Sequence, residues 1–320
     1  MTSKNVLITG AGGFIGHDLA RYFSGKGLNV AGIDVHFNQV DTSFQTIIAD
    51  YADTDKYIKL LPEAPVIYHL ASAHLDVSLD ENQYWKTNVH DIPGFINAVA
   101  GIGARRFVHV SSVGVYGHLD TIPADETTVC KPQSIYGTTK LAGEVVVKET
   151  CENCGLDYVI IRPAWVYGAS CPRTRKLIRM LQKKRFFWIG DGLNMRHPVY
   201  IDDLLYALDL SGETDECIGE TIIIGGRNAI NSRELIHTFC EIFEYPFPKV
   251  TVPFSIAELT AGLIERMASL FGVKPPISTR TLEFFKTNNA FSIEKAQKLL
   301  GFNPAFNLNK GLVCTKADMT

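Results

Sequence analysis

The sequence lacks the features that define several large classes of protein. Its 31 lysines and arginines are outnumbered by 34 acids, and the net charge of −3 provides no basic surface to attract nucleic acid. No apolar run reaches the length of about 18 residues that spans a bilayer. No signal-peptide core precedes the first predicted strand, and the sequence contains no internal repeat and no low-complexity linker. We therefore expect a globular protein with a small-molecule substrate, without nucleic-acid partners or membrane spans.

The cysteines do not form a disulfide framework. There are seven of them, an odd and scattered set, which favours reduced thiols and a cytoplasmic location. Cys151 and Cys154 form one C-x-x-C pair, which is more typical of a helix end than of a zinc or redox site when no second pair accompanies it. We expect no metal site. The 320 residues suffice for one large domain or two smaller ones.

A glycine-rich turn near the start predicts a dinucleotide site. The apolar run Val6–Thr9 is typical of a buried parallel strand and leads into Gly10, Gly13 and Gly16, after which a helical pattern continues to about residue 25. Gly10 would allow the tight turn, Gly13 a close approach of a pyrophosphate to the helix N-terminus, and Gly16 close packing of helix on strand. The alternative is a plain strand–helix turn, since the spacing is G-x-x-G-x-x-G rather than G-x-G-x-x-G.

The next two predicted strands each end at an acid. The strand 29–33 ends at Asp34, about 20 residues beyond the glycines, where a carboxylate binds both hydroxyls of an adenosine ribose and repels a 2′-phosphate. This favours NAD over NADP, although His36 could weaken the preference. The strand 44–49 ends at Asp50, for which contact with the adenine edge and a helix N-cap are equally reasonable roles.

Two further strands end in small or hydroxyl residues. The strand 65–72 breaks on small residues at its end, Ala71 and Ser72, which would let a cofactor lie close. It contains His69, which we interpret as a core histidine rather than a ligand. The strand 106–110 ends at Ser111 and Ser112. Open parallel sheets place their chemistry at these carboxyl ends.

Tyr136 and Lys140 are spaced so that a helix would bring them onto one face. A tyrosine with an ordinary pKa of about 10 is a poor base, and a neighbouring cation lowers that pKa. With a serine from the preceding strand they would form a hydroxyl, phenol and ammonium set that can exchange a proton with a substrate hydroxyl. The alternative is a surface pair on an amphipathic helix. In either case we expect the helix to begin at Ser134 and end near Cys154, with Gly155 as C-cap.

The alternation of strands and helices predicts an α/β fold with a doubly wound parallel sheet. The strand 159–162 continues this alternation, and beyond it strands and helices no longer alternate regularly. A basic stretch over 173–185 is typical of a solvated helix face, although it could meet an anionic substrate. A strand returns at 221–226, and 230–310 is mostly helical. We predict a cofactor-binding domain over 1–165, with returning segments near 199–226, and a smaller, mostly helical substrate domain over 166–320.

With these residues in place, the chain resembles the extended short-chain dehydrogenase/reductase family, the NAD-dependent epimerase/dehydratase group with a Rossmann fold. The resemblance covers about residues 4 to 312. It rests on motifs at Thr9–Gly16, His69–Ser72, Ser111–Gly117, Tyr136–Lys140, Arg162–Gly168, Gly190–Asp203 and Lys295–Pro304.

The resemblance implies roles for single residues. Tyr136 would be the catalytic acid/base, Lys140 would hold the nicotinamide ribose, and Ser112, rather than Ser111, would bond the reacting oxygen. Asn88 matches an asparagine near the active site. The implied NAD-binding residues are Gly10, Gly13, Phe14, Ile15, Gly16, Asp34, Asp50, Leu70, Ala71, Tyr136 and Lys140. The family also suggests a homodimer.

The resemblance leaves the substrate open. Arg196 stands where nucleotide-sugar enzymes often carry an arginine, and Arg280 could match a second one late in the chain. Two such arginines would suit a diphosphate. The alternative for each is an ordinary surface ion pair, which is disfavoured for Arg196 and equally reasonable for Arg280. Ala164 and Trp165 replace an expected asparagine, and the apolar stretch 252–271 would also suit a sterol-like or other lipophilic alcohol.

Two further readings of the same fold are less favoured. Val113 and Gly114 stand where 4,6-dehydratases carry an Asp-Glu pair, so a dehydratase is disfavoured because elimination of water needs that acid and base. A non-catalytic dinucleotide sensor is the remaining alternative, although such a protein would be free to lose Tyr136, Lys140 or Ser112.

Overall fold

A seven-stranded parallel sheet organises the chain. The computed structural model describes residues 5–38, 41–61, 63–74, 80–261, 282 and 285–319. Across the sheet the strands run β11 (Thr221–Ile224), β6 (Asp157–Pro163), β5 (Arg106–Val110), β4 (Val66–His69), β1 (Asn5–Thr9), β2 (Asn29–Asp34) and β3 (Gln45–Ile48). The strand order reverses between β1 and β4, the point at which doubly wound sheets bind their ligands.

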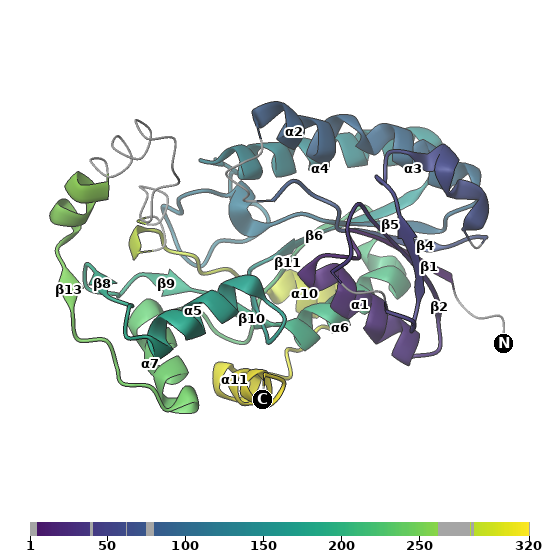
Figure 1. Cartoon of the computed structure of the whole chain (residues 1–320). Helices are drawn as coiled ribbons and strands as arrows, with labels where there is room; N and C mark the ends of the chain where they lie inside the picture. Colours follow the sequence, from purple (N-terminus) through teal and green to yellow (C-terminus); the bar gives the residue numbers. More distant parts are fainter. Residues whose placement is uncertain are drawn as a thin grey trace.

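Helices cover both faces of this sheet (Figure 1). On one side lie α1 (Phe14–Gly25), α6 (Ile201–Glu213) and α10 (Glu294–Leu300), and on the other α2 (Glu81–Trp85), α3 (Ile92–Gly101) and α4 (Ile135–Cys154). Successive strand residues point to opposite faces, so Ile8 packs in the core under α1 while Leu7 packs in the core under α3. Burial on both faces explains why the strands are continuous apolar runs and could be predicted from the sequence.

Helix α4 has the predicted boundaries because both of its ends are capped locally. The Ser134 hydroxyl accepts a hydrogen bond from the Gly137 N–H at 3.1 Å, as an N-cap does. Gly155 ends the helix in the left-handed conformation at φ 70°, which favours glycine because it has no Cβ. Cys151 is buried and Cys154 exposed in the last turn, and both are free thiols.

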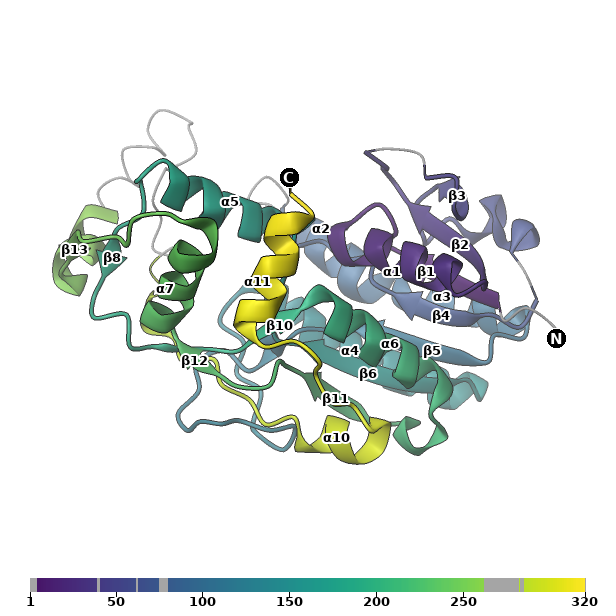
Figure 2. The same cartoon turned by 90° about the horizontal axis from the view of Figure 1, so that it is seen from below.

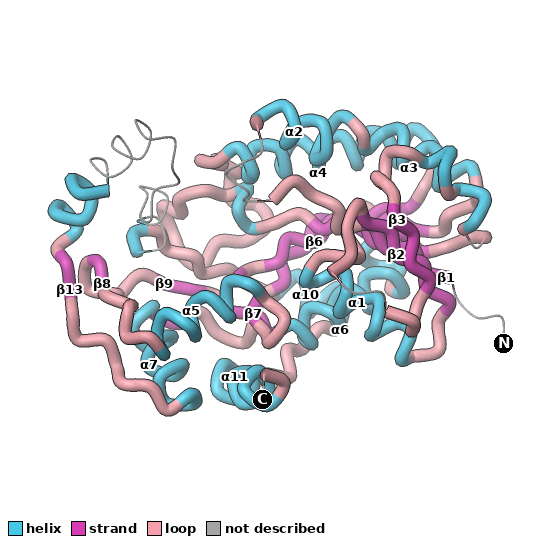
Figure 3. Tube along the Cα trace, in the orientation of Figure 1, coloured by secondary structure: helices cyan, strands magenta, loops and turns pink. Residues whose placement is uncertain are grey.

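A second group of strands and helices lies beside the main sheet. It begins with β7 (Trp165–Tyr167), which follows directly on β6. It contains three two-stranded pairs, β7 with β10 (Pro198–Tyr200), β9 (Met195–Arg196) with β12 (Ile230–Asn231), and β8 (Trp188–Ile189) with β13 (Thr251–Val252). Helices α5 (Pro172–Gln182), α7 (Ser232–Phe243) and α11 (Leu308–Ala317) pack around them (Figures 2 and 3). The described part of the predicted helical tail over 230–310 contains α7 and α10 (Glu294–Leu300), and the short strands β12 and β13 within it were missed.

Short single-turn segments connect the main elements. They are η1 (Thr54–Lys56), η2 (Ile58–Leu60), η3 (Lys86–His90), η4 (Val113–Val115) and η5 (Asp215–Cys217). Within the described ranges no helix combines the length and apolar composition needed to cross a membrane. Arg280 and the second half of the apolar stretch 252–271 lie outside the described residues. The division into two domains and the homodimer stay predictions.

Candidate active site

A cavity of about 840 Å³ opens at the carboxyl edge of the sheet, at the strand-order reversal. It is lined by the ends of β1, β2, β4, β5 and β6 and by the N-terminal residues of α1, α4 and α5. Every residue predicted to bind the cofactor lines it: Gly10, Gly13, Phe14, Ile15, Gly16, Asp34, Asp50, Leu70, Ala71, Tyr136 and Lys140, together with Ser112. Segments from five strands therefore contribute to one site.

The glycine turn is shaped by close backbone contacts. A Cβ on Gly10, whose φ is 75°, would lie 2.7 Å from the Ala71 backbone nitrogen, and one on Gly16 would lie 2.1 Å from the Gly10 carbonyl oxygen. Gly12, which the sequence did not single out, is equally constrained, because its Cβ would lie 2.0 Å from the His36 carbonyl oxygen. The turn delivers the first N–H groups of α1, which have no intrahelical acceptor, to the cavity wall. This is a cradle for an anion.

The two predicted acids lie at the glycine-turn end of the cavity. The Asp34 carboxylate accepts hydrogen bonds from the Gly12 N–H at 2.9 Å and the His36 N–H at 3.2 Å, which fixes it beside the glycine turn. Asp50 accepts from the Ala52 N–H at 3.0 Å. The residue preceding η1 is Asp53, so the alternative role of Asp50 as a helix N-cap is wrong.

Tyr136 and Ser112 meet at the other end of the cavity. Ser112 lies two residues beyond β5, at the start of η4, and accepts a hydrogen bond from the Gly114 N–H at 3.0 Å. Burial raises the pKa of Tyr136, whereas a hydrogen bond with the Ser112 side chain and the charge of Arg173 oppose that rise. We expected Lys140 to lower this pKa. The structure differs, since the cation that acts on Tyr136 is Arg173 and burial of the phenol dominates.

The sequence patterns missed two side chains next to Tyr136. The His74 ring lies edge-on to the Tyr136 ring with centroids 4.7 Å apart. Arg173, from the exposed basic run on α5, lies 3.4 Å from the His74 ring nitrogen Nε2, and both residues line the cavity. Sixty or so residues separate His74 from Tyr136, and only the tertiary fold brings them together. The cavity end around Tyr136 therefore carries a positive charge.

Lys140 is almost completely buried, at 2% exposure, and still lines the cavity. Burial lowers the pKa of its ammonium group to about 8, and the nearby charge of Glu144 opposes that change. A buried lysine that stays charged needs such compensation.

The structure also separates the two serines. Ser111 is buried and donates its hydroxyl hydrogen to Glu144 Oε1 at 2.5 Å. Both serines line the cavity, but the Ser111 hydroxyl is engaged by Glu144, while Ser112 faces Tyr136. This geometry supports Ser112 as the serine that contacts a substrate oxygen.

Asn88 and Arg196 are not among the residues that line the cavity. The Asn88 amide bridges two elements, because Oδ1 accepts from the Ala73 N–H at 2.8 Å and Nδ2 donates to Thr139 Oγ1 at 3.0 Å. Arg196 is buried in β9, where Nη1 donates to the Asn289 side-chain oxygen at 2.6 Å once that amide is oriented to satisfy both of its ends. Burial lowers the pKa of Arg196 to about 10. Their substrate roles stay predictions.

The wall that follows β6 and leads into α5 is mostly apolar. It presents Pro163, Ala164, Trp165, Val166 and Pro172 to the cavity. Among the described residues that line the cavity, the acids are Asp34 and Asp50, both at the glycine-turn end. The Tyr136 end can exchange a proton through a phenol, and no carboxylate lies there in the described part of the chain.

Comparison with known proteins bears on this geometry. The model of the NAD dependent epimerase/dehydratase family matches residues 6–225. The chain is 29% identical over 331 residues to the uncharacterized UDP-glucose epimerase YtcB of Bacillus subtilis (strain 168), covering 96% of this chain and 95% of that protein. It is 26% identical to 2-alkyl-3-oxoalkanoate reductase of Stenotrophomonas maltophilia (strain K279a), over 98% of both proteins. The crystal structure of UDP-glucuronic acid 4-epimerase from Bacillus cereus in complex with NAD superposes with a TM-score of 0.78 and 26% identity, over 98% of this chain and 96% of that chain.

Proposed function

The chain belongs to the NAD-dependent epimerase/dehydratase family, and we propose that it epimerises or oxidises a ring hydroxyl of a nucleotide-activated sugar. The observation that carries the proposal is the meeting of Ser112, Tyr136 and Lys140 at one end of a cavity whose other end is built for a dinucleotide. Proton exchange with a hydroxyl beside a redox cofactor is the chemistry that such an arrangement supports.

The residues present fit NAD. The uncapped N–H groups of α1 and the close glycine turn suit a pyrophosphate, and Asp34 suits a ribose with two free hydroxyls. Lys140 would hold the nicotinamide ribose. When bound, NAD supplies the group that accepts and returns a hydride.

The chain's own residues would manage the proton. Ser112 and Tyr136 would hold the reacting hydroxyl, and Tyr136 would take its proton as a phenolate. Burial alone disfavours that phenolate, so the Ser112 hydrogen bond and the Arg173 charge, which both lower the pKa of Tyr136, are needed for the task. In an epimerisation Tyr136 would return the proton to the same oxygen after the sugar has presented its other face.

A nucleotide sugar is supported by the similarity to YtcB and to the B. cereus epimerase, which extends over nearly the whole chain. Arg173 adds a cation at the cavity end where an anionic substrate would bind. Elimination of water is disfavoured, because η4 places Val113 and Gly114 where its acid and base would be needed.

A lipophilic alcohol or ketone is the second candidate. It is favoured by the apolar wall around Trp165 and by the full-length similarity to an oxoalkanoate reductase. A binding panel separates the two candidates.

Thermal unfolding of NAD-loaded protein would be compared with UDP-, GDP- and dTDP-sugars and with sterols and 3-oxoalkanoates. A ligand at 100 times its dissociation constant stabilises by about 2.7 kcal/mol, which is readily measured. We expect one nucleotide class to stabilise the protein. Stabilisation by lipophilic compounds alone would overturn the sugar proposal. If no compound stabilises the NAD-loaded protein, the non-catalytic dinucleotide sensor would be favoured.

A further inference from the structure

A buried carboxylate lies directly behind the proposed catalytic lysine. Tyr136, Lys140 and Glu144 follow one another at intervals of four residues along α4, so their side chains share one face of the helix. Lys140 and Glu144 are each only 2% exposed. An acid buried to this degree requires partners that compensate its charge.

Three hydrogen bonds fix the Glu144 carboxylate. Arg162 on β6 donates two hydrogen bonds to the carboxylate, from Nε to Oε1 at 2.9 Å and from Nη2 to Oε2 at 2.6 Å. Ser111 at the end of β5 donates to Oε1 at 2.5 Å. The remaining Arg162 nitrogen, Nη1, donates to the Tyr116 hydroxyl at 2.7 Å, and the guanidinium carbon lies 4.9 Å from the centre of the Tyr116 ring. The fork geometry holds the carboxylate in one orientation.

We propose that Glu144 is a positioning residue for Lys140, keeping the buried ammonium group charged where Lys140 lines the cavity beside Tyr136 and Ser112. Arg162 and Ser111 hold the carboxylate in place for this purpose. The inference rests on the cofactor-binding half of the proposed function, and it assigns to this network a task beyond packing.

The electrostatic surroundings of Lys140 support this role. Burial favours a neutral amine, and Glu144 is the charged group that opposes it. The other groups facing Lys140 provide no negative charge near neutral pH. His69 on β4 and His109 on β5 have pKa values far below the ordinary one because both rings are buried, and the pKa of Tyr136 on α4 is raised by burial. Without Glu144, Lys140 would lose its proton at lower pH.

The test is the dissociation constant for NAD, measured by calorimetry from pH 6 to pH 9.5 in the wild type, Glu144→Gln and Glu144→Asp. Protonated Lys140 makes a stronger hydrogen bond to the cofactor than the neutral amine, so affinity falls where the lysine deprotonates. We expect this fall to begin about one pH unit lower in Glu144→Gln, making NAD binding about fivefold weaker at pH 8 but within about threefold of the wild type at pH 6. Glu144→Asp keeps the charge and should restore most of the wild-type profile.

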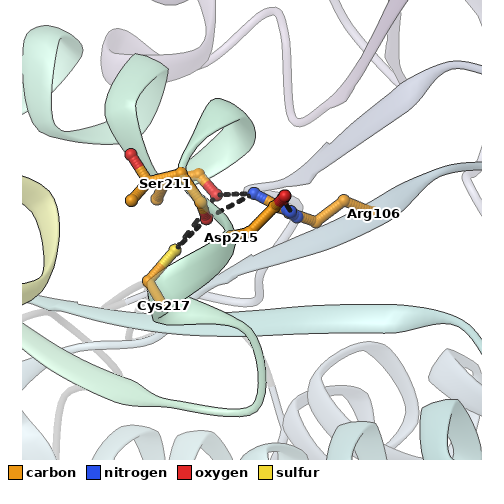
Figure 4. A network of polar contacts seen from close by, with 5 residues as sticks. Arg106, Ser211, Asp215 and Cys217 are labelled. Carbon is orange, nitrogen blue, oxygen red and sulfur yellow. Dashed lines mark hydrogen bonds and ion pairs between the residues drawn. The ribbon is translucent and has the colours of Figure 1, made fainter.

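Arg106 supplies a matched control (Figure 4). It is also a buried arginine, at the opposite end of β5, and it donates to the Ser211 and Thr214 carbonyl oxygens and to Asp215. Arg106→Gln should destabilise the fold without moving the pH at which NAD affinity falls. An equal loss of affinity at every pH in Glu144→Gln would mean that Glu144 only supports the fold, and it would overturn the inference.

A second variant and a combined outcome complete the test. If Glu144→Gln does not fold, the double variant Glu144→Gln/Arg162→Met removes both charges, a change that buried ion pairs often tolerate. In this double variant the loss of NAD affinity should again begin at lower pH than in the wild type. The same pH dependence as in the wild type would overturn the inference. A shifted profile together with no binding of any nucleotide sugar would support Glu144 as a positioning residue while refuting the proposed substrate.

Discussion

Two histidines in the centre of the sheet should make the protein lose stability in mild acid. His69 and His109 lie side by side on β4 and β5, with ring centroids 5.5 Å apart. They are 0% and 1% exposed. Burial, reinforced by the charge of Lys140, lowers the pKa of His69 to about 3 and that of His109 well below its ordinary value. Both rings are therefore neutral in the folded protein and protonate readily only after unfolding.

The sign and the size of the effect follow from these pKa values. A histidine whose pKa is depressed by folding contributes no destabilisation above the unfolded pKa of about 6.5, and it destabilises increasingly as the pH falls below that value. At pH 5 the unfolded chain gains about 2 kcal/mol from protonating each histidine. The pair should therefore cost about 4 kcal/mol of unfolding free energy between pH 7.5 and pH 5.

The assay is urea unfolding without added NAD at both pH values, comparing the wild type with His109→Phe. Phenylalanine keeps an aromatic ring in the stack but cannot take up a proton, so the variant should lose about 2 kcal/mol less than the wild type between the two pH values. His118→Gln is the control, because His118 is exposed and lies outside the sheet, and this variant should leave the difference unchanged. Equal losses in His109→Phe and the wild type would refute the reasoning.

Three more outcomes follow from the geometry. Tyr136→Phe should lower kcat by about 10²–10⁴-fold and leave the dissociation constant for NAD within about threefold, as steady-state kinetics and calorimetry would show; undiminished turnover would remove Tyr136 from the mechanism. Gly12→Ala should abolish measurable NAD binding, since its Cβ would lie 2.0 Å from the His36 carbonyl oxygen, whereas Gly94→Ala in α3, with open space around its Cβ, should bind NAD normally and gain about 0.5–1 kcal/mol of stability. Arg106→Gln should lose about 3 kcal/mol of unfolding free energy in urea titrations, and a loss below about 1 kcal/mol would show that its bonds to the end of α6 contribute little.

The sequence predicted those features that are encoded locally. Strands buried on both faces must be apolar along their whole length, and Ser134 and Gly155 mark the ends of α4 through bonds and dihedral angles within a few residues. The glycine turn, Asp34 and the Tyr136–Lys140 spacing are local patterns of the same kind, and the fold brings them to one cavity.

The features that sequence patterns missed depend on tertiary contacts. Nothing near His74 or Arg173 indicates that both would reach Tyr136, because they come from different segments of the chain. Arg162 was noted only as part of a motif, and its pairing with Glu144 depends on the packing of α4 against β6. Arg196 illustrates the converse, since a motif match could not reveal that its side chain is buried outside the cavity lining.

The central claim is that Tyr136 carries out proton exchange on a nucleotide-activated sugar. Proton NMR of NAD-loaded protein incubated with UDP-glucose, UDP-glucuronic acid and their GDP and dTDP counterparts tests it most directly. We predict that one of these compounds is converted to its C4 epimer or to an oxidised sugar, and that Tyr136→Phe slows the conversion at least 100-fold. Conversion of a lipophilic alcohol or 3-oxoalkanoate, with every nucleotide sugar left unchanged, would contradict the claim.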